Sequence, residues 1–60
     1  METLKKIREQ NLMPRIELAR KIGVTEGTIY NWEAGKTKPS DKNARKLSEI
    51  FNVNPNIFLV

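Results

Sequence analysis

The stretch RIELARKIGVTEGTIYNWEAG, residues 15–35, decides the fold of this chain. Ala19 is small enough to let a second helix approach closely, and Gly23 can take the positive φ that a tight turn demands. Apolar residues at helical spacing on both sides supply a shared core: Leu18, Ile22, Val24, Ile29 and Trp32. The pattern predicts two short helices that cross at a steep angle. Such a helix-turn-helix places its second helix in the major groove of DNA, which makes DNA binding the leading hypothesis.

The composition leaves room for one small domain, residues 1–60, and excludes several kinds of site. Sixty residues lie near the lower limit at which a hydrophobic core alone supports folding. Cysteine and histidine are absent, so no disulfide, metal site or cofactor is expected. No apolar run approaches the roughly 20 residues of a membrane span. A small-molecule ligand is not expected either. Eleven Lys and Arg against seven Asp and Glu give a net charge of +4, which suits an anionic partner.

The remaining sequence predicts an all-α fold, a compact bundle of five short helices in which helices 2 and 3 form the helix-turn-helix. We expect Thr3 to cap the first helix and Asn11 to end it. Pro14 suits the first turn of the second helix, where its missing N–H costs nothing. That helix is expected to run to about Ile22, with Gly23 closing it.

The second half of the chain predicts three more helical segments. Thr25 is placed to cap the third helix, and Ser40 to cap a fourth whose buried side carries Ala44, Leu47, Ser48 and Phe51. Asn52 is expected to end the fourth helix. A last helical turn is expected to begin at Asn54-Pro55, and the core is expected to be closed by Val53, Ile57 and Phe58.

The chain resembles the lambda-repressor-like helix-turn-helix domains of the Cro/CI, or Xre, family over essentially its whole length. The matching residues are Leu4, Ile7, Arg8, Glu17-Leu18-Ala19, Ile22-Gly23-Val24, Thr28-Ile29, Trp32-Glu33, Gly35, Lys36, Pro39-Ser40, Leu47, Phe51 and Val53. The resemblance implies binding of double-stranded DNA through the major groove. It also implies an ion pair between Arg8 and Glu33 that orients the third helix, since relatives join the same two positions.

Two places depart from the family pattern. Relatives begin the second helix with Ser or Thr followed by a Gln that contacts a phosphate, whereas this chain has Pro14-Arg15. The resemblance therefore implies a phosphate contact from Arg15, made by charge and with looser geometry. The third helix opens with Glu26-Gly27, where relatives carry longer polar or basic side chains. This opening predicts modest sequence specificity, since Gly27 has no side chain with which to read a base.

The groove-facing residues of the third helix are the candidates for base contacts. Asn31 is the leading one, since an amide pairs bidentately with adenine, and Thr28 suits a base edge or a thymine methyl. Glu26 can only accept a hydrogen bond. The alternative is that these are ordinary solvated positions. The base-contacting set is Glu26, Gly27, Thr28 and Asn31.

The candidates for phosphate contacts flank the same helix. Lys36 and Lys38 follow it in a loop that tracks the DNA backbone in relatives, and Lys42 lies near the start of the fourth helix. Tyr30 either donates its hydroxyl to a phosphate or covers the core, and Thr25 acts as a cap with any DNA contact additional. The phosphate-contacting set is Arg15, Thr25, Tyr30, Lys36, Lys38 and Lys42. Trp32 is assigned to the core instead of to base stacking, because it lies three residues after Ile29.

The segment from residue 50 to residue 60 contains no charged side chain, which favours an interface. Relatives dimerise through this end of the domain, so a weak homodimer is expected through Pro55, Ile57, Leu59 and Val60. The alternative is simple completion of the core.

We therefore predict a DNA-binding transcriptional regulator, a small repressor that binds a pseudo-palindromic operator as a dimer. The alternative is a protein-interaction module on the same fold, such as an antitoxin subunit or a transcriptional adaptor. An enzyme is rejected, because Ser40 and Ser48 have no histidine to activate them. The expected location is the cytoplasm of a prokaryotic cell or a phage-infected host, in association with the nucleoid.

Overall fold

The computed structural model describes residues 2–59, which form four α-helices and one 3-10 turn with no strand among them. The elements are α1 (Glu2–Gln10), α2 (Arg15–Ile22), α3 (Glu26–Glu33), α4 (Asp41–Phe51) and η1 (Pro55–Phe58). The all-α prediction is confirmed. The fifth expected helix is wrong in kind, because η1 has only four residues and its hydrogen bonds close over three, as in Ile57 N to Asn54 O at 3.2 Å.

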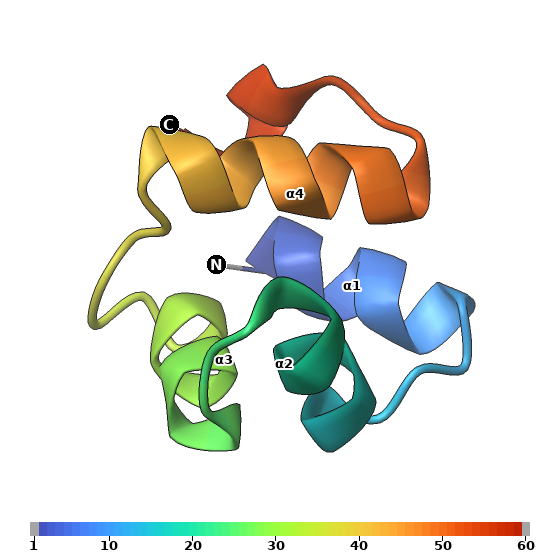
Figure 1. Ribbon diagram of the computed structural model, residues 1–60, viewed down its shortest axis with the longest axis vertical. Helices are drawn as coiled ribbons and strands as arrows, with labels where there is room; N and C mark the ends of the chain where they lie inside the picture. The colour runs from blue at the N-terminus through green and yellow to red at the C-terminus, as the bar shows by residue number, and fades with distance from the viewer. Residues whose placement is uncertain (1, 60) are drawn as a thin grey trace.

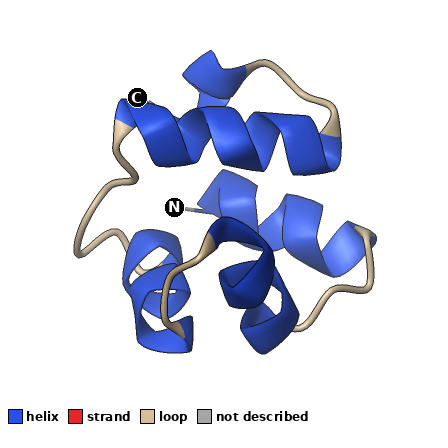
Figure 2. Ribbon diagram, viewed as in Figure 1, coloured by secondary structure: helices blue, strands red, loops and turns tan. Residues whose placement is uncertain are grey.

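The helices pack in two groups around one core. Figure 1 shows α4 and η1 at one side of the molecule and α2 and α3 at the other, with α1 between them in this view. Short loops join all of these elements (Figure 2). The packed pairs are α2 with α3, α4 with η1, α1 with α3, α1 with η1 and α2 with α4. The result is a nearly isometric domain of 23 × 23 × 20 Å.

Most helix ends lie where the sequence predicts them. Gly23 closes α2 in the left-handed region at φ 89°, and Asn52 closes α4 at φ 56°. The hydroxyls of Thr25 and Ser40 accept from backbone N–H groups of the helices that follow, each at 3.2 Å. These predicted boundaries are confirmed.

Two predicted N-termini are wrong by a residue or two. Thr3 lies inside α1, because the helix already begins at Glu2. Pro14 precedes α2 as its N-cap with an extended ψ of 153°, so the first helical residue is Arg15. The Pro14 carbonyl still accepts from Leu18 N at 3.1 Å, which lets the ring stand outside the helix while its carbonyl joins the first helical turn.

The core is built from every element. Its fully covered members include Leu4 of α1, Leu18 of α2, Ile29 of α3, Leu47 of α4 and Phe58 of η1. Ala19, Ile22, Trp32, Ala44 and Phe51 complete it, and Val53 and Ile57 pack against it while partly exposed. Ser48 is half-buried, and its hydroxyl donates to Arg45 O at 2.7 Å, so it satisfies its own helix instead of filling the core. The assignment of Trp32 to the core is confirmed.

Candidate nucleic-acid interface

The orientation of α3 follows from which of its residues are buried. Ile29, Trp32 and Glu33 are buried against the rest of the domain. Gly27 is exposed, while Thr28 and Asn31 are half-buried. Because residues three and four positions apart share one side of a helix, Asn31 lies beside both Thr28 and Gly27, on the part of the helix surface that Ile29 and Trp32 leave uncovered. Glu26 and Tyr30, also four apart and exposed, lie on the neighbouring side.

Two hydroxyls near the start of α3 are coupled. Thr25 Oγ1 lies 2.9 Å from Thr28 Oγ1 and also accepts from the Thr28 backbone N–H at 3.2 Å. The capping role predicted for Thr25 is thus confirmed, and the same contact fixes the rotamer of Thr28. The backbone carbonyl of Asn31 accepts from Lys36 N at 2.9 Å and closes the end of α3.

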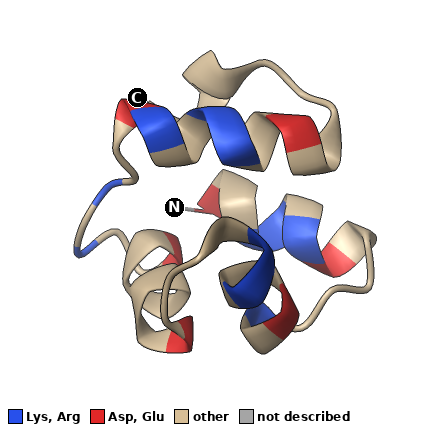
Figure 3. Cartoon of the chain, in the orientation of Figure 1, with Lys and Arg blue, Asp and Glu red and all other residues tan. Residues whose placement is uncertain are grey.

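The positive charge lies beside α3 and not on it. The helix reads EGTIYNWE and contains two carboxylates and no Lys or Arg. Figure 3 shows basic residues in the loop that follows α3 and on α1, α2 and α4. Among the predicted phosphate contacts, Lys36, Lys38 and Lys42 are exposed, and the side chain of Arg15 is 32% exposed. The domain thus presents a helix with a polar outer side flanked by cations.

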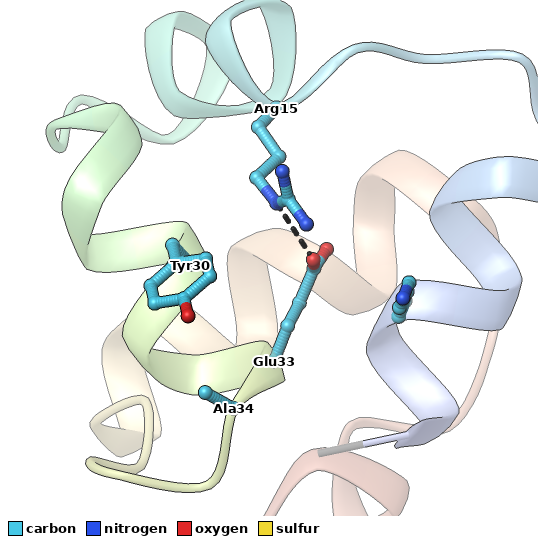
Figure 4. Close-up of a pocket in the computed structure, with 5 residues that line it drawn as sticks. Arg15, Tyr30, Glu33 and Ala34 are labelled. Carbon is cyan, nitrogen blue, oxygen red and sulfur yellow. Dashed lines mark hydrogen bonds and ion pairs between the residues drawn. The ribbon is translucent and has the colours of Figure 1, made fainter.

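Two of these cations lie close to the ring of Tyr30. The centroid of its ring lies 5.5 Å from Arg15 Cζ and 5.6 Å from Lys36 Nζ, within cation–π range. The ring borders an open hollow of about 220 Å³ lined by Lys5, Arg15, Tyr30, Glu33 and Ala34 (Figure 4). Tyr30 is 48% exposed, so it lies at the surface and only partly covers the core.

Glu33 joins three helices through a buried carboxylate. Its Oε2 accepts from Arg8 Nε at 2.6 Å and its Oε1 from Arg8 Nη2 at 3.3 Å, which confirms the predicted pair between α1 and α3. Oε1 also accepts from Arg15 Nε at 2.8 Å (Figure 4). Burial by itself raises the pKa of the Glu33 carboxyl, but the hydrogen bonds and charges of Arg8 and Arg15 outweigh burial and hold that pKa below its ordinary value of 4.5.

Sequence reasoning missed two contacts of basic residues. Arg15 is predicted as a phosphate contact alone, yet its guanidinium is also the second partner of Glu33. Lys46 is not among the residues to which the sequence assigned a contact, but its Nζ donates to Ile22 O at 3.0 Å and so satisfies a carbonyl at the end of α2. The helical spacing of each element gives no signal for such contacts, because both depend on how separate helices pack.

The C-terminal region carries part of the expected apolar surface. Leu59 is 37% exposed, and Pro55 and Ile57 are half-buried. The predicted interface residue Val60 lies outside the described residues. Other exposed apolar side chains are Leu12 at 90% and Ile16 at 44%, near the turn between α1 and α2.

Residues 2–59 contain no cluster of acidic side chains that is suited to a metal ion. Within the same range, no helix is long and apolar enough to cross a membrane.

The sequence matches known proteins over most of its length. The helix-turn-helix family of Cro/C1 type matches residues 4–58. Two proteins of Archaeoglobus fulgidus, each named an uncharacterized HTH-type transcriptional regulator, are 41% and 39% identical to it over 49 residues. Those matches cover 82% of this chain and 69% and 70% of the relatives.

A protein of Haemophilus influenzae with the same description is 45% identical over 38 residues, which cover 63% of this chain and 16% of that longer protein. No solved structure matches the sequence significantly. The buried face of α3, the glycine-closed turn before it and the Arg8–Glu33 pair agree with the family match. This chain belongs to the Cro/C1-type helix-turn-helix family of DNA-binding regulators.

Proposed function

We propose that this domain regulates transcription by placing α3 in the major groove of duplex DNA. The observation that carries the proposal is the separation of roles around α3. Its outer side offers Gly27, Thr28 and Asn31 without a basic side chain, while exposed cations lie on the flanking segments. Base edges are read by hydrogen bonds in the groove, whereas phosphates are met by positive charge on either side.

Asn31 is proposed as the principal base-reading residue. Its side chain lies on the outer side of α3 and its amide suits a bidentate contact to adenine. Asn31→Ala should cost about 1–3 kcal/mol of binding on a site selected from random duplexes and little on unselected DNA. Equal losses on both DNAs would exclude base reading by Asn31. Glu26, Gly27 and Thr28 complete the proposed base-contacting set, with Gly27 permitting close approach of the backbone.

Lys38 and Lys42 are proposed as simple phosphate contacts, because both are exposed side chains on segments that flank α3. Thr25, at the N-terminus of α3, is proposed to add a phosphate contact to its capping role. Each phosphate that is neutralised makes the slope of log K against log salt about 0.9 steeper. Lys38→Gln should therefore weaken binding to all sequences alike and flatten the slope by about one unit for each phosphate that Lys38 neutralises. A salt-independent affinity would refute DNA binding.

Dimerisation is proposed through Pro55, Ile57, Leu59 and Val60, as a weak contact that forms on a pseudo-palindromic operator and represses transcription. The supporting observation is an uncharged segment with Leu59 at the surface. Two domains would then set their α3 helices about 34 Å apart, one turn of DNA. Sedimentation of the wild-type chain and of Leu59→Lys tests this surface. A stable dimer that is unaffected by Leu59→Lys would place the interface elsewhere.

A second candidate function is a protein-interaction module such as an antitoxin subunit or an adaptor. The observation that favours it is Glu26 exposed in the first turn of α3, where it opposes nearby phosphates. Selection from random duplex DNA at low salt separates the two functions. Recovery of a defined site supports the regulator, and failure to retain any duplex supports the module.

A further inference from the structure

Arg15 is held from two directions. Its Nε donates to Glu33 Oε1 at 2.8 Å, and its Cζ lies 5.5 Å from the centroid of the Tyr30 ring. Glu33 is fixed in turn by Arg8 Nε at 2.6 Å, and the Glu33 side chain is only 3% exposed. A long surface arginine ordinarily loses much rotamer freedom when it binds an anion. At Arg15 the contacts with Glu33 and Tyr30 already restrict that freedom in the free protein.

The same guanidinium still has donors to offer. It carries five N–H groups, of which the hydrogen bond to Glu33 uses the one on Nε. The side chain is 32% exposed and borders the open hollow beside Tyr30. The expectation of a loose charge contact at this position therefore does not fit the geometry, which favours a directed hydrogen bond.

The surroundings of the hollow favour an anion. Lys5 lines it from α1, and Lys36 Nζ lies 5.6 Å from the centroid of the Tyr30 ring. The carboxylate of Glu33 is shared between two arginines, so cationic groups outnumber it four to one when Lys5 and Lys36 are included. Tyr30 itself supplies a hydroxyl at the surface.

We propose that Arg15, Tyr30 and Lys36 form one preorganised binding site for a single backbone phosphate of DNA, with Glu33 as the positioning residue that fixes the Arg15 guanidinium. The inference rests on the proposed function and refines it. Arg15 and Lys36 share one phosphate instead of meeting two, and the geometry of Arg15 matters as well as its charge. Arg and Lys are not interchangeable at such a site, because an ammonium lacks the rigid fork that serves two acceptors in fixed directions.

The first test separates geometry from charge on a random-sequence duplex. Arg15→Lys should keep the salt slope but weaken binding about tenfold, because one ammonium has to choose between Glu33 and the phosphate. Arg15→Gln should weaken binding at least as much but flatten the slope by less than about 0.9 for each domain bound, because Lys36 still neutralises the shared phosphate. Arg15→Gln combined with Lys36→Gln should flatten the slope by about 0.9 for each domain. The matched controls are Arg20→Lys and Arg20→Gln, since Arg20 is an exposed arginine on the same helix. Wild-type affinity in Arg15→Lys would refute the proposed phosphate-binding site.

The second test asks whether one phosphate is shared. Lys36→Gln alone changes an exposed loop residue and leaves the Arg8–Glu33–Arg15 contacts in place, so its folding is expected to match wild type. If the phosphate is shared, Arg15→Gln combined with Lys36→Gln weakens binding by less than the product of the single effects. Arg15→Gln combined with Lys38→Gln should give the full product, because that pair meets different phosphates.

The outcomes distinguish this inference from the proposed function. If the domain binds duplex DNA and the losses of affinity from Arg15→Gln and Lys36→Gln multiply in the double variant, the shared phosphate-binding site is refuted while DNA binding still holds. If the wild-type domain retains no duplex DNA at low salt, both the proposed function and the proposed phosphate-binding site are refuted. Circular dichroism of each variant confirms that the comparison is made between folded proteins.

Discussion

Replacement of Glu33 by Gln removes the carboxylate that joins α3 to Arg8 of α1 and Arg15 of α2. The Arg8 guanidinium, whose side chain is 9% exposed, then keeps its charge in buried surroundings without a carboxylate partner among residues 2–59, while Met13 O still accepts from its Nη1 at 2.9 Å. Breaking a buried ion pair by removal of one partner costs about 3–5 kcal/mol. Gln retains one acceptor oxygen, so we expect a destabilisation near the lower end of that range.

That destabilisation is large for a domain of this size. At about 0.05–0.15 kcal/mol per residue, the free energy of unfolding of a 60-residue chain is roughly 3–9 kcal/mol. A loss of about 3 kcal/mol leaves roughly 0–6 kcal/mol, so Glu33→Gln should unfold at a much lower urea concentration than wild type. Urea titration followed by Trp32 fluorescence and far-ultraviolet circular dichroism measures the change.

Arg15→Gln is the matched control. It removes the other ion pair of the same carboxylate, but Arg15 is a third exposed and Glu33 keeps Arg8. Its expected cost is about 1 kcal/mol or less, as for partly solvated pairs. Equal destabilisation in the two variants, or a Glu33→Gln protein as stable as wild type, would refute the claim that Arg8 depends on this carboxylate for its burial.

The pH dependence, the orientation of α3 and the backbone at two turns give three more predictions. Because the folded-state pKa of Glu33 is held below 4.5, its ion pairs contribute fully to stability above that pH, and this contribution is lost as the pH falls through the folded-state pKa. In thermal melts, the melting temperature of the wild type should therefore approach that of Glu33→Gln only in that acidic range. Trp32→Ala should cost about 3–5 kcal/mol of stability and unfold the domain, whereas Thr28→Ala should remain folded by circular dichroism and bind DNA more weakly. A folded Trp32→Ala protein that loses only DNA affinity would mean that α3 is rotated about its axis relative to the orientation described above. Leu12 adopts φ 54° and is 90% exposed, so Leu12→Gly should raise the free energy of unfolding by about 0.5–1 kcal/mol in urea titration. Gly23 adopts φ 89° with open space around an added Cβ, so Gly23→Ala should lower the free energy of unfolding by about 1 kcal/mol. A less stable Leu12→Gly protein would contradict the argument that the left-handed backbone at Leu12 is strained.

The sequence by itself determined the helices and the identity of the core. Apolar spacing placed Ile29 and Trp32 on the buried side of α3, and residues with special local chemistry marked the boundaries, as Gly23, Thr25 and Ser40 illustrate. These features are local, since a cap or a left-handed residue acts within one turn of chain. The same locality explains the errors at Thr3 and Pro14, where neighbouring positions satisfy the first turn equally well.

Only the tertiary structure decided which charges meet. The sequence indicated that Arg8 pairs with Glu33 through the family resemblance, but nothing local indicated that Arg15 shares this carboxylate or that Lys46 caps α2 from α4. These contacts join residues 18 and 24 positions apart and depend on the crossing angles of whole helices. The tertiary structure also set Arg15 Cζ and Lys36 Nζ at 5.5 and 5.6 Å from the centroid of the Tyr30 ring, although the three residues come from α2, the loop after α3 and α3 itself.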